Sequence, residues 1–297
     1  MFNKMVIIII GILMMISGCK KQFDLTKLRG DIEKVIATEP DATIAIAFED
    51  LKTGEKIFIN EKEQMHAAST MKTPVMIEVF KQATEGKFNL SDSLLIKNEF
   101  KSIVDESTFS LSPEDDSDEI VYRRIGKKMS IYDLVYQMIT VSSNFATNIL
   151  IELVKPENVM QTMRAIGAEN IQVLRGVEDI KAYRQGLNNT TDAFDMYLIM
   201  KKIAKREIVT PEACDEMIKI LLDQRFKDKI PRYLPSTLKI AHKTGWINGI
   251  DHDVAIVYLT PDHPYILVVL TKGIENHVRA QKLIADVSKL VYDALNS

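Results

Sequence analysis

The chain has 297 residues and a formal net charge of −3 at pH 7, with 46% hydrophobic and 27% charged residues. This length suits one large domain or two interleaved ones, and the composition is typical of a globular protein, which excludes a collagen-like or low-complexity chain. A charge this small excludes the basic footprint of nucleic-acid-binding proteins, so we expect no nucleic acid partner.

The first residues have the pattern expected of a targeting segment. Residues 5–16 are almost entirely apolar, and Ile16-Ser17-Gly18-Cys19 follows them. The apolar stretch has the length of a signal-peptide core and is short for a membrane-spanning helix. Small residues before a cysteine resemble a bacterial lipobox, which implies a signal peptide over residues 1–18, lipidation of Cys19 and a tether over residues 19–23. The chain would then be lipid-anchored at the periplasmic face of a bacterial cell envelope; a plain anchor helix is the alternative.

A helix and a hairpin open the folded part of the chain. Apolar side chains recur at helical spacing over residues 24–37. Two apolar, β-branched segments, residues 43–48 and 56–60, flank a turn that contains Gly54. This pattern predicts an antiparallel pair of strands.

The segment His66-Ala67-Ala68-Ser69 leads into a further helix, which contains Pro74. Proline offers no N–H to the carbonyl of Thr70 and would clash with it in a regular helix. We therefore expect a tight first turn through residues 69–72, followed by regular helix.

Helices dominate the middle of the chain, and we assign residues 87–224 to an all-α domain. Residues 112–119 are acidic and rich in turn formers, which predicts a surface loop; a calcium site is the alternative, although the spacing is not that of an EF-hand. A loop rich in glycine and asparagine covers residues 175–191. Helical patterns cover residues 130–141, 144–153, 157–166, 192–205 and 211–222.

The pattern changes to that of strands near the C-terminus. Three strand-like segments and a long amphipathic helix cover residues 238–243, 253–259, 265–271 and 275–295. We predict an α+β fold: an antiparallel five-stranded sheet flanked by N- and C-terminal helices, plus an all-α lobe. The α/β domain comprises residues 24–86 and 225–297, and a site between the two domains is expected.

Ser69 and Lys72 are the first candidate catalytic pair. A serine hydroxyl is a poor nucleophile at neutral pH and needs a neighbouring base or proton relay. Residues three apart on a helix share a face, and burial lowers the pKa of a lysine toward the range in which it accepts protons. The pattern alone is weak, because a capping serine beside a surface lysine has the same spacing.

Two further motifs accompany that pair: Ser142-Ser143-Asn144 between two helices, and Lys243-Thr244-Gly245 at the end of a strand. Taken singly, Asn144 is better explained as a helix N-cap and Lys243 as a charge at the end of a strand. Together, and in this order, the three motifs resemble the signature of class A β-lactamases and penicillin-binding proteins. The surrounding strings also resemble this family, over residues 138–148, 242–246 and 252–255.

The resemblance implies a serine β-lactamase/DD-peptidase-like fold and a role for each motif. Ser69 would be the acylated nucleophile, and Lys72 its proton acceptor or relay partner. Ser142 would pass a proton to the leaving nitrogen. Asn144 would hold the side-chain amide of the substrate and also contact Lys72.

The third motif would bind the substrate. Lys243 and Thr244 would hold its carboxylate, and Gly245 would let it approach the backbone. The backbone N–H groups of Ser69 and Trp246 would form the oxyanion hole, a feature worth ~3 kcal/mol per donor in other acyl-transfer enzymes. Trp246 replaces a residue that is commonly small in the family, and we expect it to narrow the mouth of the site.

The sequence also departs from the family pattern. Ser143 replaces the usual aspartate of the second motif. Glu178 is the best candidate for activating the water that hydrolyses the acyl-enzyme, with Asp179 as the neighbouring candidate. The family spacing around Glu178 is absent. The alternative is that both acids only order the loop. Many class A enzymes carry an arginine soon after the third motif, and Arg279 is the candidate substitute here.

The sequence therefore predicts a lipid-anchored, class A β-lactamase-like serine hydrolase that opens a β-lactam ring through an acyl-Ser69 intermediate and then hydrolyses it. No metal or organic cofactor is expected, because the five histidines are scattered. A DD-carboxypeptidase, amidase or esterase acting on cell-wall peptides, and a non-hydrolysing penicillin-binding sensor, are the alternatives. The expected partners are a β-lactam or cell-wall peptide and, through the lipid, the membrane; we expect a monomer.

Overall fold

The computed structural model describes residues 24–296. The expected signal peptide, the lipidation site Cys19 and the tether over residues 19–23 lie outside the described residues. Among the residues that are described, no helix has both the length and the apolar character required to cross a membrane.

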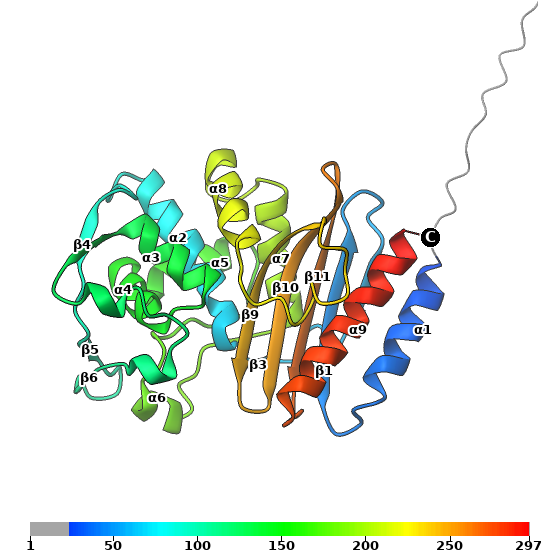
Figure 1. Cartoon of the computed structure of the whole chain (residues 1–297), viewed down its shortest axis with the longest axis horizontal. Helices are drawn as coiled ribbons and strands as arrows, with labels where there is room; N and C mark the ends of the chain where they lie inside the picture. The colour runs from blue at the N-terminus through cyan, green and yellow to red at the C-terminus, as the bar shows by residue number, and fades with distance from the viewer. Residues whose placement is uncertain (1–23, 297) are drawn as a thin grey trace, which may run out of the picture.

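A five-stranded antiparallel sheet forms the centre of one half of the molecule, with the strand order β2-β1-β11-β10-β9 (Figure 1). Its strands are β1 (Thr43–Asp50), β2 (Lys56–Ile59), β9 (Lys239–Ile247), β10 (Ile250–Thr260) and β11 (His263–Lys272). The predicted α+β fold is thus confirmed. The predicted end of β9 at Lys243 is wrong, because the strand continues to Ile247, so Lys243-Thr244-Gly245 lies within the strand.

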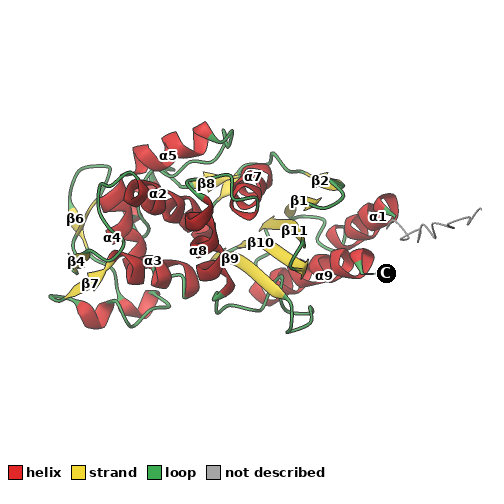
Figure 2. Ribbon diagram, turned by 90° about the horizontal axis from the view of Figure 1, so that it is seen from above, coloured by secondary structure: helices red, strands yellow, loops and turns green. Residues whose placement is uncertain are grey.

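Two helices from opposite ends of the chain cover the outer face of this sheet: α1 (Leu25–Ile36) and α9 (His277–Leu295) (Figure 2). Ile32 of α1 and Ile284 of α9 pack with Ile44 of β1 in one buried apolar cluster. This cluster explains the helical spacing of apolar residues at both ends of the sequence, because only the sheet-facing side of each helix is buried.

The other helices lie beyond the inner face of the sheet and form a helical lobe. They are α2 (Lys72–Thr84), α3 (Ile131–Thr140), α4 (Asn144–Val154), α5 (Pro156–Ala165), α6 (Ile180–Arg184), α7 (Ala193–Ala204) and α8 (Pro211–Leu222). Several begin at a side-chain cap: the side chains of Ser130, Ser143, Asp192 and Thr210 each accept a backbone N–H of the following first turn.

The structure also contains short elements that the sequence pattern did not indicate. They are β3 (Met65–His66), β4 (Ser93–Leu95), β5 (Phe100–Lys101), β6 (Thr108–Phe109), β7 (Lys128–Ser130), β8 (Thr190–Thr191) and the helix α6. Strands of two or three residues are too short to show a period, so only their pairing in space reveals them.

The segment around Ser69 is built as predicted. A 3₁₀ turn, η1 (Ala68–Met71), leads directly into α2, which begins at Lys72. This turn packs against β9, an edge strand of the sheet. A Cβ atom at Gly245 would lie 3.1 Å from the backbone nitrogen of Ser69, so glycine at this position is what allows the turn and the strand to approach so closely.

Candidate active site

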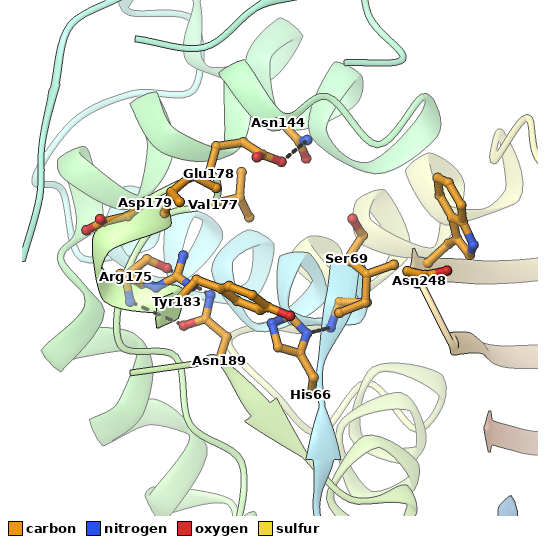
Figure 3. A pocket seen from close by; sticks show the side chains of 14 residues that line it. His66, Ser69, Asn144, Arg175, Val177, Glu178, Asp179, Tyr183, Asn189 and Asn248 are labelled. Carbon is orange, nitrogen blue, oxygen red and sulfur yellow. Dashed lines mark hydrogen bonds between the residues drawn. The ribbon is translucent and has the colours of Figure 1, made fainter. Parts of the chain in front are cut away.

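Ser69 lies in the wall of two adjoining cavities between the sheet and the helical lobe. Asn144, Glu178 and Trp246 line both cavities with it, and Figure 3 shows the side chains that line one of them. The Ser69 hydroxyl makes no hydrogen bond with any residue in the described range 24–296. A hydroxyl that lines a cavity without an internal partner is available to a ligand.

His66 fixes the turn that presents Ser69. Ala68 has a positive φ of 45°, and its N–H donates to His66 Nδ1 over 3.0 Å. Burial, together with the charge of Arg175, lowers the pKa of His66 to about 4. The ring is therefore neutral at pH 7, with a lone pair for the Ala68 N–H. The sequence analysis gave His66 no role, because its hydrogen bond with the Ala68 N–H is visible only in the structure.

Lys72 is fully buried beneath Ser142 and Asn144. Its Nζ donates to Ser142 O over 2.6 Å, to Ser142 Oγ over 3.3 Å and to Asn144 Oδ1 over 2.8 Å. Desolvation lowers the pKa of Lys72 to about 7, against the nearby carboxylates of Asp116 and Glu178, which raise it. Near neutral pH a substantial fraction of this amine is therefore unprotonated and able to accept a proton.

Ser142 bridges the two lysines of the motifs. Its Oγ accepts from Lys72 Nζ and, over 3.0 Å, from Lys243 Nζ. A hydroxyl has two acceptor lone pairs and one hydrogen, so two lysine donors leave the hydrogen for another acceptor. Burial lowers the pKa of Lys243 well below its usual value, and the charges of Lys72 and Lys229 lower it further.

Glu178 reaches the site from the loop before α6. Its Oε1 accepts from Asn144 Nδ2 over 3.2 Å, and this contact is drawn in Figure 3. Burial raises the pKa of Glu178, as does the neighbouring carboxylate of Asp115, whereas the charge of Lys72 lowers it. The carboxylate thus lies in the cavity beside a motif residue.

Asp179, the neighbouring candidate, has a different position. Its carboxylate accepts from Ser102 Oγ and from the Ile103 N–H, each over 3.0 Å, and from the Ala182 N–H at the start of α6. In Figure 3 it points away from Ser69. All of these contacts tie the loop to its surroundings, so Asp179 orders the loop while Glu178 faces the cavity.

The loop that carries Glu178 is clamped to α4. Asn148 Oδ1 accepts from the Val177 N–H over 2.7 Å, and Asn148 Nδ2 donates to Val177 O over 2.9 Å. A Cβ at Gly176 would lie 2.3 Å from Asn148 Oδ1, so no larger residue fits without displacing this clamp. Glu178 itself has a positive φ of 61°, which favours glycine and indicates a backbone held by its surroundings.

Asp116 braces the second motif from a neighbouring loop. Ser143 Oγ caps α4 by accepting the Ala146 N–H over 3.1 Å. The Asp116 carboxylate accepts the N–H groups of Asn144 and Phe145, over 3.0 Å and 2.9 Å. The acidic stretch 112–119 predicted only a surface loop, and its sequence holds no signal that one of its carboxylates braces the second motif.

On the sheet side, Thr244, Gly245 and Trp246 line the larger of the two cavities. The Trp246 side chain is 57% exposed at its mouth, and its ring lies 4.9 Å from that of His277. That Trp246 narrows the mouth stays a prediction. Lys243 lies below the cavity wall, fully buried, and reaches the site through Ser142.

Arg279 does not take part in this site, so its expected role is wrong. It is exposed and pairs with Glu39 over 2.6 Å at the outer surface. The cation that lines the cavity near β9 is Lys229, whose Nζ donates to Gly245 O over 2.8 Å and pairs with Asp251 over 2.8 Å. The loop before β9 brings this lysine to the strand, and no motif in the sequence marked it.

Within residues 24–296, no group of three or more histidine, cysteine, aspartate or glutamate side chains is arranged to hold a metal ion. The described part of the chain has one free cysteine, Cys214, which is buried in α8.

A model of the "Beta-lactamase enzyme family" matches residues 27–295 of the chain. Among curated proteins, the β-lactamase CARB-4 of Pseudomonas aeruginosa is 27% identical over 160 residues. That alignment covers 53% of this chain and 51% of CARB-4, so the chain spans about half the length of the curated relative it matches.

Solved structures match over almost the whole chain. PBP-A is 26% identical with a TM-score of 0.79, and the match covers 92% of this chain and 97% of PBP-A. A variant of PBP-A has been solved as an acyl-enzyme complex with penicillin G. The extended-spectrum β-lactamase TLA-3, at 21% identity and a TM-score of 0.81, shares the fold over 92% of this chain and 100% of its own.

Proposed function

The chain belongs to the β-lactamase enzyme family, and from this premise we propose that it is a class A β-lactamase-like serine hydrolase. It would open a cyclic amide through an ester on Ser69 and then hydrolyse that ester. The observation that carries the proposal is the contact between Ser142 Oγ and both Lys72 and Lys243 beside a free Ser69 hydroxyl.

Acylation begins when Ser69 Oγ attacks the amide carbonyl. Its proton passes to the neutral amine of Lys72, directly or through a relay, and the C–O bond forms as a tetrahedral oxyanion develops. The N–H groups of Ser69 and Trp246 receive that oxyanion, since Gly245 allows η1 to approach β9 closely.

The ring opens when the C–N bond breaks and the nitrogen takes up a proton. Ser142 donates it, because its two lone pairs already accept from lysines and its hydrogen is left over. Lys72 returns the proton taken from Ser69 to Ser142. Asn144 binds the side-chain amide of the substrate. Thr244, which lines the cavity, contacts the carboxylate of the substrate, and the buried Lys243 supports this contact from behind the wall.

Deacylation requires a water molecule, which Glu178 activates. The raised pKa of this carboxyl makes it a better base than an exposed glutamate, and its contact with Asn144 keeps it beside the acyl group. Water adds to the ester carbonyl, the C–Oγ bond breaks, and Ser69 recovers its proton.

A penicillin-binding protein that remains acylated is the second candidate, favoured by the match to PBP-A over 97% of that chain. The two functions differ only in deacylation. The position of Glu178 in the cavity favours the hydrolase, and the targeting segment supports attachment to the cell envelope through Cys19 as part of the same proposal.

Intact-protein mass spectrometry after a penicillin pulse tests the proposal. We expect a transient adduct on Ser69 with continuing release of opened product in the wild-type protein, and no adduct in Ser69→Ala. An adduct that outlasts the substrate in the wild-type protein would instead establish the penicillin-binding function, and absence of any adduct would refute both.

A further inference from the structure

His252 of β10 is a buried polar side chain that the proposed reaction has not yet used. It is fully buried and lies on the same face of β10 as Val254 and Ile256, which belong to the core between the sheet and the helical lobe. Its Nε2 lies 2.9 Å from His66 O, and this contact joins the sheet to the segment that leads into Ser69. A carbonyl oxygen can only accept, so the Nε2–H of His252 donates this hydrogen bond.

The carbonyl of His66 depends on this donor. His66 lies opposite Thr190 in the β3–β8 pair. Thr190 directs both its N–H and its carbonyl oxygen to Gln172, over 2.9 and 2.8 Å, so it offers no N–H to His66. Removal of the His252 imidazole would therefore leave this part-buried oxygen without its partner, at a cost in free energy. The side chain of His252 is thus matched to one carbonyl of the segment before Ser69.

His66 passes this constraint to the backbone of Ser69. Its Nδ1 accepts from the Ala68 N–H over 3.0 Å, as drawn in Figure 3, and Ala68 has a positive φ of 45°. A left-handed alanine is costly and persists only where its surroundings fix it. The next N–H along the chain is that of Ser69, one of the two proposed oxyanion donors. A displacement of His66 would therefore change the direction of this N–H.

The other proposed donor, the Trp246 N–H, belongs to β9, the strand that pairs with β10. Gly245 lies opposite His252 in this pair. Lys229 Nζ donates to Gly245 O over 2.8 Å and to His252 O over 3.1 Å, so one lysine ties the two strands together at this point. The backbone of His252 is therefore fixed to the strand that carries one donor, and its side chain is bonded to the turn that carries the other.

We propose that His252 is a positioning residue for acylation: by holding His66 O, it keeps the Ser69 N–H in a fixed position relative to the Trp246 N–H. This inference rests on the proposed function, because an oxyanion forms only if Ser69 is acylated. His252 lines neither active-site cavity, so it acts through His66. Oxyanion donors are effective only when they point to the position where the charge develops. A small displacement of one donor should slow acylation but leave the binding of intact substrate almost unchanged.

Two substitutions of His252 separate the donor from the rest of the side chain. His252→Leu removes the N–H, whereas His252→Gln retains a side-chain N–H donor. The full-length variants are mixed with penicillin in a stopped-flow instrument, which gives the acylation rate constant and the dissociation constant of the non-covalent complex. His252→Leu should acylate at least about tenfold more slowly, with a dissociation constant within about threefold of the wild-type value. His252→Gln should recover most of the rate.

Rapid-mixing infrared difference spectroscopy reports on the oxyanion donors directly. Hydrogen bonds to the ester carbonyl of the acyl-enzyme lower its stretching frequency. The carbonyl band of His252→Leu should therefore lie at higher frequency than the bands of the wild-type protein and of His252→Gln. A role confined to stability would lower the midpoint of urea unfolding without moving this band.

His263→Leu is the matched control, because His263 is another histidine of the sheet. Its Nε2 lies 2.9 Å from Asp50 Oδ1, so its side chain bonds to the end of β1 rather than to the Ser69 turn. This variant should keep the acylation rate and the carbonyl band of the wild type. If His252→Leu does not fold, His66→Leu and His66→Asn give the same comparison at a half-buried position, because asparagine offers an oxygen acceptor in place of Nδ1.

The outcomes separate this inference from the proposed function. An adduct in the wild type, with equal acylation rates and equal band positions in the wild type and His252→Leu, would overturn the positioning role alone. A folded His252→Gln that is as slow as His252→Leu would also overturn it, because the N–H donor would then have no effect. Absence of any adduct in the wild-type protein would refute the proposed function, and this inference with it.

Discussion

Side chains that are individually unremarkable acquire unusual chemistry at this site through burial and shared contacts. Lys72 and Lys243 are both fully buried, and both donate to the hydroxyl of Ser142. Positive φ angles at Ala68, Ser142 and Glu178 place three non-glycine residues of the site in the left-handed region. Backbone of this kind is costly by about 1–3 kcal/mol per residue, so the surrounding contacts must hold it in place.

The pKa of Lys72 predicts how acylation depends on pH. The neutral amine accepts the proton, so the second-order acylation rate constant should rise about tenfold per pH unit below pH 7 and level off above it. Asp116 raises this pKa through its charge, so Asp116→Asn should move the midpoint to lower pH. Stopped-flow acylation rates across the pH range measure it.

The control for that profile is Asp115→Asn, which removes an equal charge from an exposed neighbour that makes no hydrogen bond to α4. Its midpoint should stay close to that of the wild type. If Asp116→Asn lowers the rate at every pH but leaves the midpoint unmoved, its charge does not act on Lys72.

Substitutions of the adjacent Ser142 and Ser143 should have different effects, one on the acylation rate and the other on stability. Ser142→Ala removes the proton donor and should slow acylation by about 10²–10⁴-fold with little loss of stability. Ser143→Ala removes the cap of α4 and should lower the free energy of unfolding by ~1 kcal/mol while acylation changes only a few-fold. Acylation kinetics and urea denaturation of both variants measure this crossover, and similar effects of the two substitutions would contradict the assigned contacts.

The sequence predicted the residues whose spacing repeats a motif. The fold brings Lys72 and Lys243 to the hydroxyl of Ser142, and Ser69 lines the same cavity as Ser142. The sequence could not identify His66, Asp116 or Lys229. Each of these acts through a contact with a distant backbone atom or a turn geometry, and such contacts leave no period or motif in the sequence.

At the scale of elements, long helices and strands were predictable because each buries one face of a regular pattern. The prediction ended β9 too early, because the buried residues of this strand continue through Lys243 and Thr244, which are polar. Helix α6 has only five residues, and its start depends on the cap at Asp179 rather than on an apolar stripe. Tertiary contacts therefore decide the boundaries that the pattern leaves open.

The clamp between α4 and the Glu178 loop predicts a selective defect. Gly176→Ala would place a methyl group against the Asn148 amide and displace its two hydrogen bonds to Val177. Deacylation should slow by about tenfold or more, because Glu178 loses its position, whereas acylation should change little. The acyl-enzyme should then accumulate, as measured by pre-steady-state mass spectrometry.

Gly30→Ala is the matched control, because a Cβ there meets nothing within 4 Å and the position lies in helix α1. Its acylation and deacylation rates should equal those of the wild type. A deacylation rate of Gly176→Ala equal to that of the wild type would show that the clamp does not position Glu178.

At the scale of the whole molecule, the sheet and the helical lobe share one core. Buried residues of the inner sheet face, such as Val254 and Val268, belong to the same apolar cluster as Met76 of α2 and Leu134 of α3. A site between the two halves is stable only if this shared core keeps them in a fixed relation. Helices α1 and α9, from opposite ends of the chain, pack together on the outer face of the sheet. The strands that adjoin these helices in the sequence therefore meet in one sheet.

This shared core predicts a single unfolding transition. The fluorescence of Trp246, the single tryptophan of the chain, reports on β9, and far-UV circular dichroism reports mainly on the helices. The two signals should change at the same urea concentration, because neither half buries its inner surface alone. Separate midpoints would show that the lobes fold independently.

The central claim is that Ser69 is acylated and that Glu178 promotes release of the acyl group. Intact-protein mass spectrometry of the wild type and of Glu178→Gln after a penicillin pulse tests both parts at once. The account predicts an adduct on Ser69 in both proteins, short-lived in the wild type and at least about 10²-fold longer-lived in the variant. Equal adduct lifetimes, or no adduct on Ser69, would contradict it.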